Sequence, residues 1–325
     1  ENYEFRIAQR IAKKAGVDII PIKRDFDHYG KTSEECVKIS CGMGDCFDNH
    51  YLGFRDNFKQ HGIKNILSGL YFDYFFKSLA LDRKTVPYWG TNYRIEKEDN
   101  FKFEHYQSCF TFATEMSRRA EARMFNLFPY QTESGLPERT RLEIACKRTI
   151  PLCYTSGNTQ AVVSQKVLPW TLPILDTDVL KLYLRVPVAL RMNRKLSLKL
   201  ARIIGGKDML GIPDANTRTR IDASDFERMV SWYMNSIGAK LRGIIGIKKT
   251  GIATEESWPD YIYYMKNSEI IKRLWERPNP IANELFLQIA GQEYFRKNIA
   301  EYNGWRSLFL FIRFFTLKLW MDQMC

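Results

Sequence analysis

A Ser-Gly pair at positions 68 and 69 stands where a short apolar run gives way to an aromatic stretch. The pattern predicts a strand over residues 64–67 and a helix over residues 71–81. In open α/β sheets ligands bind at the carboxyl ends of strands, and the free N–H groups at the start of the next helix suit a phosphate. The backbone of Ser68 and Gly69 is therefore a candidate phosphate-binding turn. An ordinary turn before a helix is the alternative.

Two lysines could also act on the same ligand. Lys195 and Lys199 are one helical turn apart in residues 194–204, an amphipathic stretch with its basic residues on one side. Such a pair could neutralise a phosphate or could simply form a solvated face. Asp176 precedes a predicted helix, and as its N-cap it needs no chemical role.

The elements that must position the Ser-Gly turn form an α/β segment. Residues 4–15 are predicted as a helix that stops at Gly16, and residues 17–22 as a short buried strand. Helix followed by strand is the second half of a parallel βαβ unit. A loop rich in Asp, Gly and Cys follows, and a helix over residues 49–61 leads to the strand at 64–67.

From residue 101 onward the pattern is mostly helical. The predicted helices are 101–128, 140–146, 178–184, 194–204, 224–237, 283–302 and 305–320. The fifth begins with the capping-box pair Ser224 and Glu227, and the sixth has Asn283 as its predicted N-cap. The last, over residues 305–320, is apolar with three basic residues, which predicts a buried or interfacial helix. The chain thus divides into an α/β segment, residues 1–100, and a mostly helical region, residues 101–325.

The charge balance favours an anionic partner. The chain has 49 Lys and Arg against 37 Asp and Glu, a formal net charge of +12. A nucleotide, a nucleic acid or an acidic membrane surface would suit this charge, and a solvated basic surface is the alternative. A basic protein that binds nucleic acid is one hypothesis, although we find no nucleic-acid motif beyond charge. No specific nucleic acid is expected as a partner.

Cysteine usage and hydropathy indicate a cytoplasmic protein. The seven cysteines include no CxxC pair, which gives no zinc or disulfide framework, and reduced thiols fit the cytosol. No apolar run reaches the length of a transmembrane segment. Because an amphipathic helix begins almost at Glu1, we expect further sequence upstream.

An ordered series of motifs resembles the synthetase half of the asparagine synthetase-like family. GIKNILSGLYFDYFFKS resembles the family's second nucleotide loop, where Ser68, Gly69 and Asp73 match. LPILDTDVLKLYLRVP resembles its next conserved element, where Pro173 and Asp176 match. The opening helix, the basic helix RKLSLKLARII and the segment GIPDAN also follow the family's order. The resemblance covers residues 1 to about 225.

The resemblance implies a Rossmann-like parallel sheet of the adenine nucleotide alpha hydrolase type, with ATP and Mg²⁺ as cofactors. The family forms an amide through an acyl-adenylate, from a carboxylate substrate and an amine or ammonia donor that a separate glutaminase could supply. The backbone of Ser68 and Gly69 would then bind nucleotide, and Asp73 would bind both nucleotide and metal. Lys195 and Lys199 would carry a catalytic role, by neutralising pyrophosphate or the adenylate.

Departures from the family pattern leave a second hypothesis open. The motif's catalytic Glu corresponds to Leu70, which cannot act as an acid or a base, and its second Gly corresponds to Tyr71. The first nucleotide loop would lie upstream of Glu1. The alternative function is therefore a catalytically degenerate family member that serves as a binding or scaffold protein.

Overall fold

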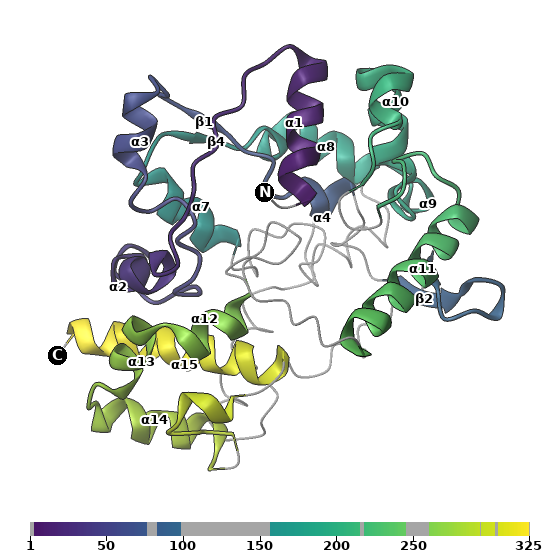
Figure 1. Cartoon of the computed structure of the whole chain (residues 1–325). Coiled ribbons are helices and arrows are strands. Elements are labelled where there is room, and N and C mark those ends of the chain that lie inside the picture. The colour runs from purple at the N-terminus through teal and green to yellow at the C-terminus, as the bar shows by residue number, and fades with distance from the viewer. Residues whose placement is uncertain are drawn as a thin grey trace.

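The computed structural model describes residues 3–76, 83–98, 157–214, 218–244, 260–292, 294–302 and 305–324 (Figure 1). Its helices and strands are, in chain order, α1 (Tyr3–Ala15), α2 (His28–Ser40), α3 (Arg55–Gln60), β1 (Ile66–Leu67), α4 (Phe72–Phe76), β2 (Arg83–Pro87), η1 (Tyr88–Gly90), β3 (Arg94–Glu98), α7 (Gly157–Gln165), β4 (Trp170–Thr171), η4 (Pro173–Leu175), α8 (Thr177–Arg185), α9 (Val188–Arg191), α10 (Lys195–Leu210), α11 (Asp225–Ile244), α12 (Tyr261–Asn267), α13 (Glu269–Glu276), α14 (Pro280–Ala290), η5 (Ile299–Glu301) and α15 (Trp305–Met324). The predicted helices 101–128 and 140–146 lie outside the described residues.

The parallel sheet within the described residues is the pair β1 and β4, in which Ile66 lies opposite Trp170. Helix α7 precedes β4, and its Val163 packs in a buried cluster with Cys36 and Leu52, which Val167, just beyond the end of α7, also joins. The prediction of a short buried strand at residues 17–22 was wrong, since the segment has no strand conformation and most of it is exposed. Pro21 within it has no N–H to donate to a neighbouring strand. The full Rossmann-like sheet stays a prediction.

Helix α2 occupies the segment predicted as a loop, and that prediction was wrong. Its buried positions, His28, Tyr29, Ser33, Cys36, Val37 and Ser40, recur at helical spacing. Four of these six are polar or sulfur-containing, so a pattern of apolar residues alone does not reveal the periodicity. Helix α3 begins only at Arg55, since turns occupy residues 50–53 of the predicted helix 49–61.

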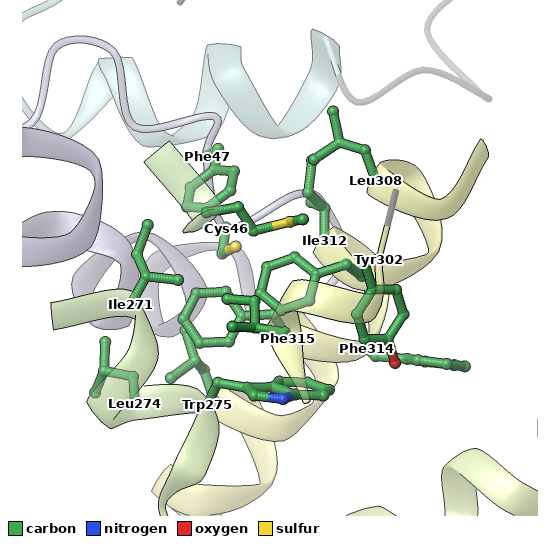
Figure 2. Packing of buried hydrophobic residues seen from close by; sticks show 14 of the residues in the cluster. Cys46, Phe47, Ile271, Leu274, Trp275, Tyr302, Leu308, Ile312, Phe314 and Phe315 are labelled. Carbon is green, nitrogen blue, oxygen red and sulfur yellow. The ribbon is translucent and has the colours of Figure 1, made fainter. Parts of the chain in front are cut away.

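The largest core lies beneath α15, at the opposite end of the molecule from β1 and β4 (Figure 1). Figure 2 shows Trp275 of α13 beside Phe315 of α15, with Cys46 and Phe47 entering from the N-terminal part of the chain. Helix α15 is the predicted apolar helix 305–320, and its Leu308, Phe311, Phe315 and Leu319 are buried. Within the described residues, no helix has both the length and the apolar character needed to cross a bilayer.

The predicted helix 283–302 has different bounds in the structure. Helix α14 begins at Pro280, because the Asn279 side chain accepts a hydrogen bond from the Ala282 N–H (2.8 Å). It ends at Gly291, whose positive φ of 77° suits only glycine well. Asn283 therefore lies inside the helix and is not its cap.

A β-hairpin, β2 and β3, is fastened to the turn between α9 and α10. Asn193 exchanges three hydrogen bonds of 2.8–2.9 Å with Glu96 of β3, two through its side chain and one through its N–H. The next residue, Arg194, forms an ion pair with Asp214 (3.1 Å). This turn therefore joins the hairpin to the loop that precedes α11.

Local signals placed α1, α8 and the starts of α10 and α11 correctly, whereas α10 and α11 extend beyond the predicted ends at residues 204 and 237. Helix α1 ends as predicted before Gly16, and α8 begins after Asp176. Helix α11 begins with the predicted capping box, in which the Glu227 N–H donates to Ser224 Oγ (3.2 Å) and Glu227 accepts from the Ser224 N–H (2.7 Å). Helix α10 is interrupted at Gly206, where its Gly-Gly pair predicted an end.

Candidate functional site

Two turns that are far apart in the sequence lie side by side at the carboxyl ends of β1 and β4. The Ser68 N–H donates to the Thr171 carbonyl (2.9 Å), and the Ile66 N–H donates to the Pro169 carbonyl (2.9 Å). Ser68 and Gly69 therefore follow β1 at the same edge at which η4 follows β4. The two motifs singled out in the sequence, at Ser68 and at Pro173, meet at this edge, which we call the strand-end site.

The Ser68 turn is closed by its own hydrogen bonds. The Ser68 hydroxyl accepts from the Leu70 N–H (3.1 Å), and the Gly69 carbonyl accepts from the Phe72 N–H (3.1 Å). The Ser68 side chain is therefore engaged in shaping the turn. Any ligand contact of this turn would fall to the backbone around Gly69.

Gly69 is open on the side where a side chain would stand. A Cβ built on it meets no atom within 4 Å, and its φ is not in the left-handed region. The backbone conformation thus does not demand glycine here. A glycine with free space in front of it allows a ligand to approach the backbone closely.

The left-handed residue of the turn is Tyr71, which has a φ of 70° and is buried. Its ring belongs to a small apolar cluster with Phe75, Ile174 and Tyr183, against which Leu70 also packs. Phe75 and Tyr183 meet edge to face, with ring centroids 4.6 Å apart. Packing therefore holds in place a backbone geometry that costs a non-glycine residue about 1–2 kcal/mol.

A buried cation lies against the far side of this cluster. The Arg191 guanidinium lies 4.9 Å from the centre of the Tyr183 ring, and the whole side chain is buried. Arg191 ends α9, just before the turn that starts α10. Sequence reasoning missed this arginine, because nothing in its local pattern distinguishes a buried guanidinium from a solvated one.

Asp176 caps α8. Its carboxylate accepts hydrogen bonds from the N–H groups of Asp178 (2.9 Å) and Val179 (3.4 Å). The residue is exposed, and its carboxylate is engaged in these two bonds. This confirms the prediction of Asp176 as an N-cap.

Lys195 and Lys199 are both exposed on the first turns of α10. Leu196, between them, packs against the apolar cluster of the strand-end site. The start of α10 therefore lies near that site, and its two lysines are exposed to solvent there. Within the described residues, no interaction joins either lysine to Ser68 or Gly69, and their catalytic role stays a prediction.

Asp73 lies in α4, one turn beyond Gly69. Its side chain is outside the part of the chain that the structure describes, so its predicted roles in metal and nucleotide binding stay predictions. Among the described residues, no group of three or more His, Cys, Asp or Glu side chains could hold a metal ion.

A second polar group, which the sequence did not reveal, is buried between α2 and the loop before α3. Tyr29 accepts a hydrogen bond from Arg24 and is joined to His50 Nδ1 (2.9 Å). Burial, followed by the charge of Arg24, lowers the pKa of His50 to about 3, and burial raises the pKa of Tyr29 to about 12. Both groups are therefore neutral near pH 7 and act as packing and hydrogen-bonding residues.

Asp48 is an acidic residue in the same loop, and its pKa is also shifted. Burial, and then the neighbouring charge of Asp45, raise the pKa of its carboxyl group to about 8. A carboxylic acid that is neutral near pH 7 is a feature of some active sites. Here Asp48 directly follows Cys46 and Phe47, two buried members of the aromatic core.

Comparison with known proteins adds no relative. No protein-family model, no curated protein and no solved structure matches this chain. The resemblance to asparagine synthetases therefore rests on the motifs alone.

Proposed function

We propose that this chain is an asparagine synthase-related, ATP-dependent amidoligase whose nucleotide site is the strand-end site. The observation that carries the proposal is the pairing of β1 with β4, which sets the Ser68 turn beside the Pro173 turn. The two family-like motifs are far apart in the sequence, so only the fold brings them together. A nucleotide site at the carboxyl ends of adjacent parallel strands is the usual arrangement in α/β folds.

The residues at this edge fit part of what ATP with Mg²⁺ requires. Gly69 leaves space for a phosphate next to the backbone, and the start of α10 adds the cations Lys195 and Lys199 nearby. Asp73 would supply the oxygen ligand that Mg²⁺ prefers. When bound, ATP would supply the activation of a carboxylate as its acyl-adenylate with release of pyrophosphate, and an amine or ammonia would then displace AMP to form the amide. This chain's residues would bind and orient the phosphates.

One observation favours the alternative, a degenerate member that binds without catalysis. Leu70 stands where the family has its catalytic Glu, and it packs into the apolar cluster with Tyr71. A leucine that anchors the turn by apolar contacts can replace neither the charge nor the proton transfer of a carboxyl group. Nucleotide binding without turnover would be the expected behaviour of such a protein.

Titration calorimetry with ATP and Mg²⁺ tests the proposal, with Gly69→Ala as the decisive variant. The added methyl group has room in the free protein but occupies the space in front of the backbone, so we expect a Kd at least tenfold weaker. Gly238→Ala is the matched control, because Gly238 of α11 is equally open and has no positive φ. Asp73→Ala should weaken binding only when Mg²⁺ is present.

The outcomes of these titrations distinguish the proposed ligase from a degenerate binder and from a scaffold protein. Wild-type binding that Gly69→Ala weakens and Gly238→Ala leaves unchanged supports the nucleotide site. Pyrophosphate release with a panel of carboxylates would then distinguish the ligase from the degenerate binder. If the wild-type protein binds no ATP, the nucleotide site is excluded and a scaffold function is favoured.

A further inference from the structure

Helix α11 carries an exposed apolar stripe along four turns. Its members, spaced three or four residues apart, are Phe226, Val230, Met234, Ile237 and Leu241. This spacing puts them on one side of the helix. Met234 is 65% exposed and Ile237 is 52% exposed. A surface helix of a globular protein normally buries its apolar stripe against the core, so the exposure of this stripe needs an explanation.

The tip of the β2–β3 hairpin extends this stripe beyond Phe226. Trp89 at the tip is 74% exposed, and its ring centroid lies 5.9 Å from that of Phe226. Tyr88 stacks on Trp89 with ring centroids 5.1 Å apart. The Asn92 N–H donates to the Tyr233 hydroxyl (3.1 Å), which ties the hairpin to the middle of α11. Hairpin and helix therefore form one preformed surface, which we call the α11 face.

The Trp89 backbone is also costly in the free protein. Trp89 and Gly90 have φ values of 48° and 70°, the left-handed pair that hairpin turns usually fill with Asn-Gly. A tryptophan there is strained, and its ring gains little burial while it stays in water. A partner that covers the ring would supply the missing burial.

The area of the α11 face matches a protein interface. The exposed parts of its six apolar side chains amount to roughly 600 Å², the upper end of the largest patch on an ordinary monomer. Homodimer interfaces are about two-thirds apolar, so such a patch with its polar rim corresponds to about 900 Å² for each partner. That is the size of a standard specific interface.

The charges around the face argue for a second copy of the chain and against a lipid surface. Asp225 and Glu227 lie at the Phe226 end of α11, and Lys240 lies near the other end. Helices that bind anionic membranes carry mainly Lys and Arg on their polar side, whereas here the acidic residues flank the most aromatic part. Two copies related by a two-fold axis can run antiparallel, with the acidic turn of each near the basic turn of the other. We propose that the α11 face is the interface of a homodimer.

Sedimentation velocity on the whole chain tests the proposal. We expect the wild type to be dimeric at micromolar concentration, and Met234→Lys and Ile237→Lys to weaken association at least a hundredfold, because each buries a charge at the centre of the interface. Ile203→Lys is the matched control, since Ile203 is a 71% exposed isoleucine on α10. Far-UV circular dichroism should show that all variants keep their helices. An Ile237→Cys variant should form an intermolecular disulfide under oxidation.

Three results would overturn the proposal. A wild type that stays monomeric at about 100 µM excludes a stable homodimer. A dimer that survives both lysine variants places the interface elsewhere. A monomer that pellets with phosphatidylserine vesicles, and loses this with Ile237→Lys, makes the α11 face a lipid-binding surface instead.

Discussion

The core beneath α15 and the strand-end site use aromatic side chains for different ends. In the core, Trp275 packs against Phe311 and Phe315 and the backbone is regular. At the strand-end site, Tyr71 packs with Phe75 and Tyr183, and its backbone is held in a left-handed conformation. The first cluster stabilises helices, whereas the second offsets the cost of an unusual turn. Strained backbone supported by its surroundings is commonest at functional sites. The contrast therefore agrees with placing the candidate function at the strand ends.

The largest expected effect is a loss of stability in the core. Phe315→Ala removes a fully buried ring, and we expect the free energy of unfolding to fall by about 3–5 kcal/mol. Phe309→Ala on the same helix is the control, because that ring is half exposed and should cost far less. Urea unfolding measures both. Equal losses for the two variants would contradict the placement of the core.

Asp48 is expected to make stability depend on pH at the edge of that core. With its pKa raised to about 8, Asp48 keeps its proton in the folded state from pH 3.8 to 8, where the unfolded state releases it. This contribution to stability is complete at low pH and is lost as the pH rises through 8. The pKa of His50 is lowered to about 3, so its effect on stability has the opposite sign: it lowers the free energy of unfolding as the pH falls, and only below pH 6.5.

Burial also raises the pKa of the neighbouring Asp45, so comparison with a variant at position 48 is needed to separate the contribution of Asp48 between pH 6.5 and 8. The difference in unfolding free energy between Asp48→Asn and the wild type should grow in favour of the variant by about 2 kcal/mol across this window. Urea unfolding at the two pH values measures the difference. A difference that does not change with pH would mean that Asp48 is ionised in the folded protein.

The smallest expected effect tests the strain at Tyr71. Both Tyr71→Ala and Tyr71→Gly lose the ring, but only glycine adopts the positive φ without cost, so the Gly variant should be more stable than the Ala variant by about 1 kcal/mol. At Phe75, within α4, the order should be the reverse by a similar amount. Thermal unfolding of the four variants measures the order of stability at both positions. The same order at both positions would remove the distinction drawn between the turn and a regular helix.

Local signals in the sequence predicted the elements that depend on neighbours along the chain. The capping box of Ser224 and Glu227 fixed the start of α11, and Asp176 fixed the start of α8. The Ser68 turn was found because a β-strand, a Ser-Gly pair and a helix follow one another there. Its proximity to the Pro173 turn was not predictable from spacing alone, since pairing between distant strands leaves no local pattern.

Elements that depend on tertiary burial escaped prediction. Helix α2 buries His28, Ser33 and Cys36, which a pattern of apolar residues does not include. The positive φ of Tyr71 is set by the cluster around its ring, and a tyrosine in the sequence gives no sign of it. Whether Asp73 and the two lysines of α10 serve a nucleotide depends on side-chain positions that the sequence motifs do not fix.

Helix α15 is hydrogen-bonded both to α2 and to the loop that follows α2, which affects how the protein folds during synthesis. The Cys46 N–H donates to the Thr316 hydroxyl (2.9 Å), and the Gln323 side chain donates to the Glu34 carbonyl (2.8 Å). Thr316 and Gln323 are translated 270 and 289 residues after their partners Cys46 and Glu34. At a translation rate of about 5–20 residues per second, the side of α2 that packs against α15 stays uncovered for roughly 15–60 seconds. During synthesis, α2 would be a natural site for a chaperone to bind.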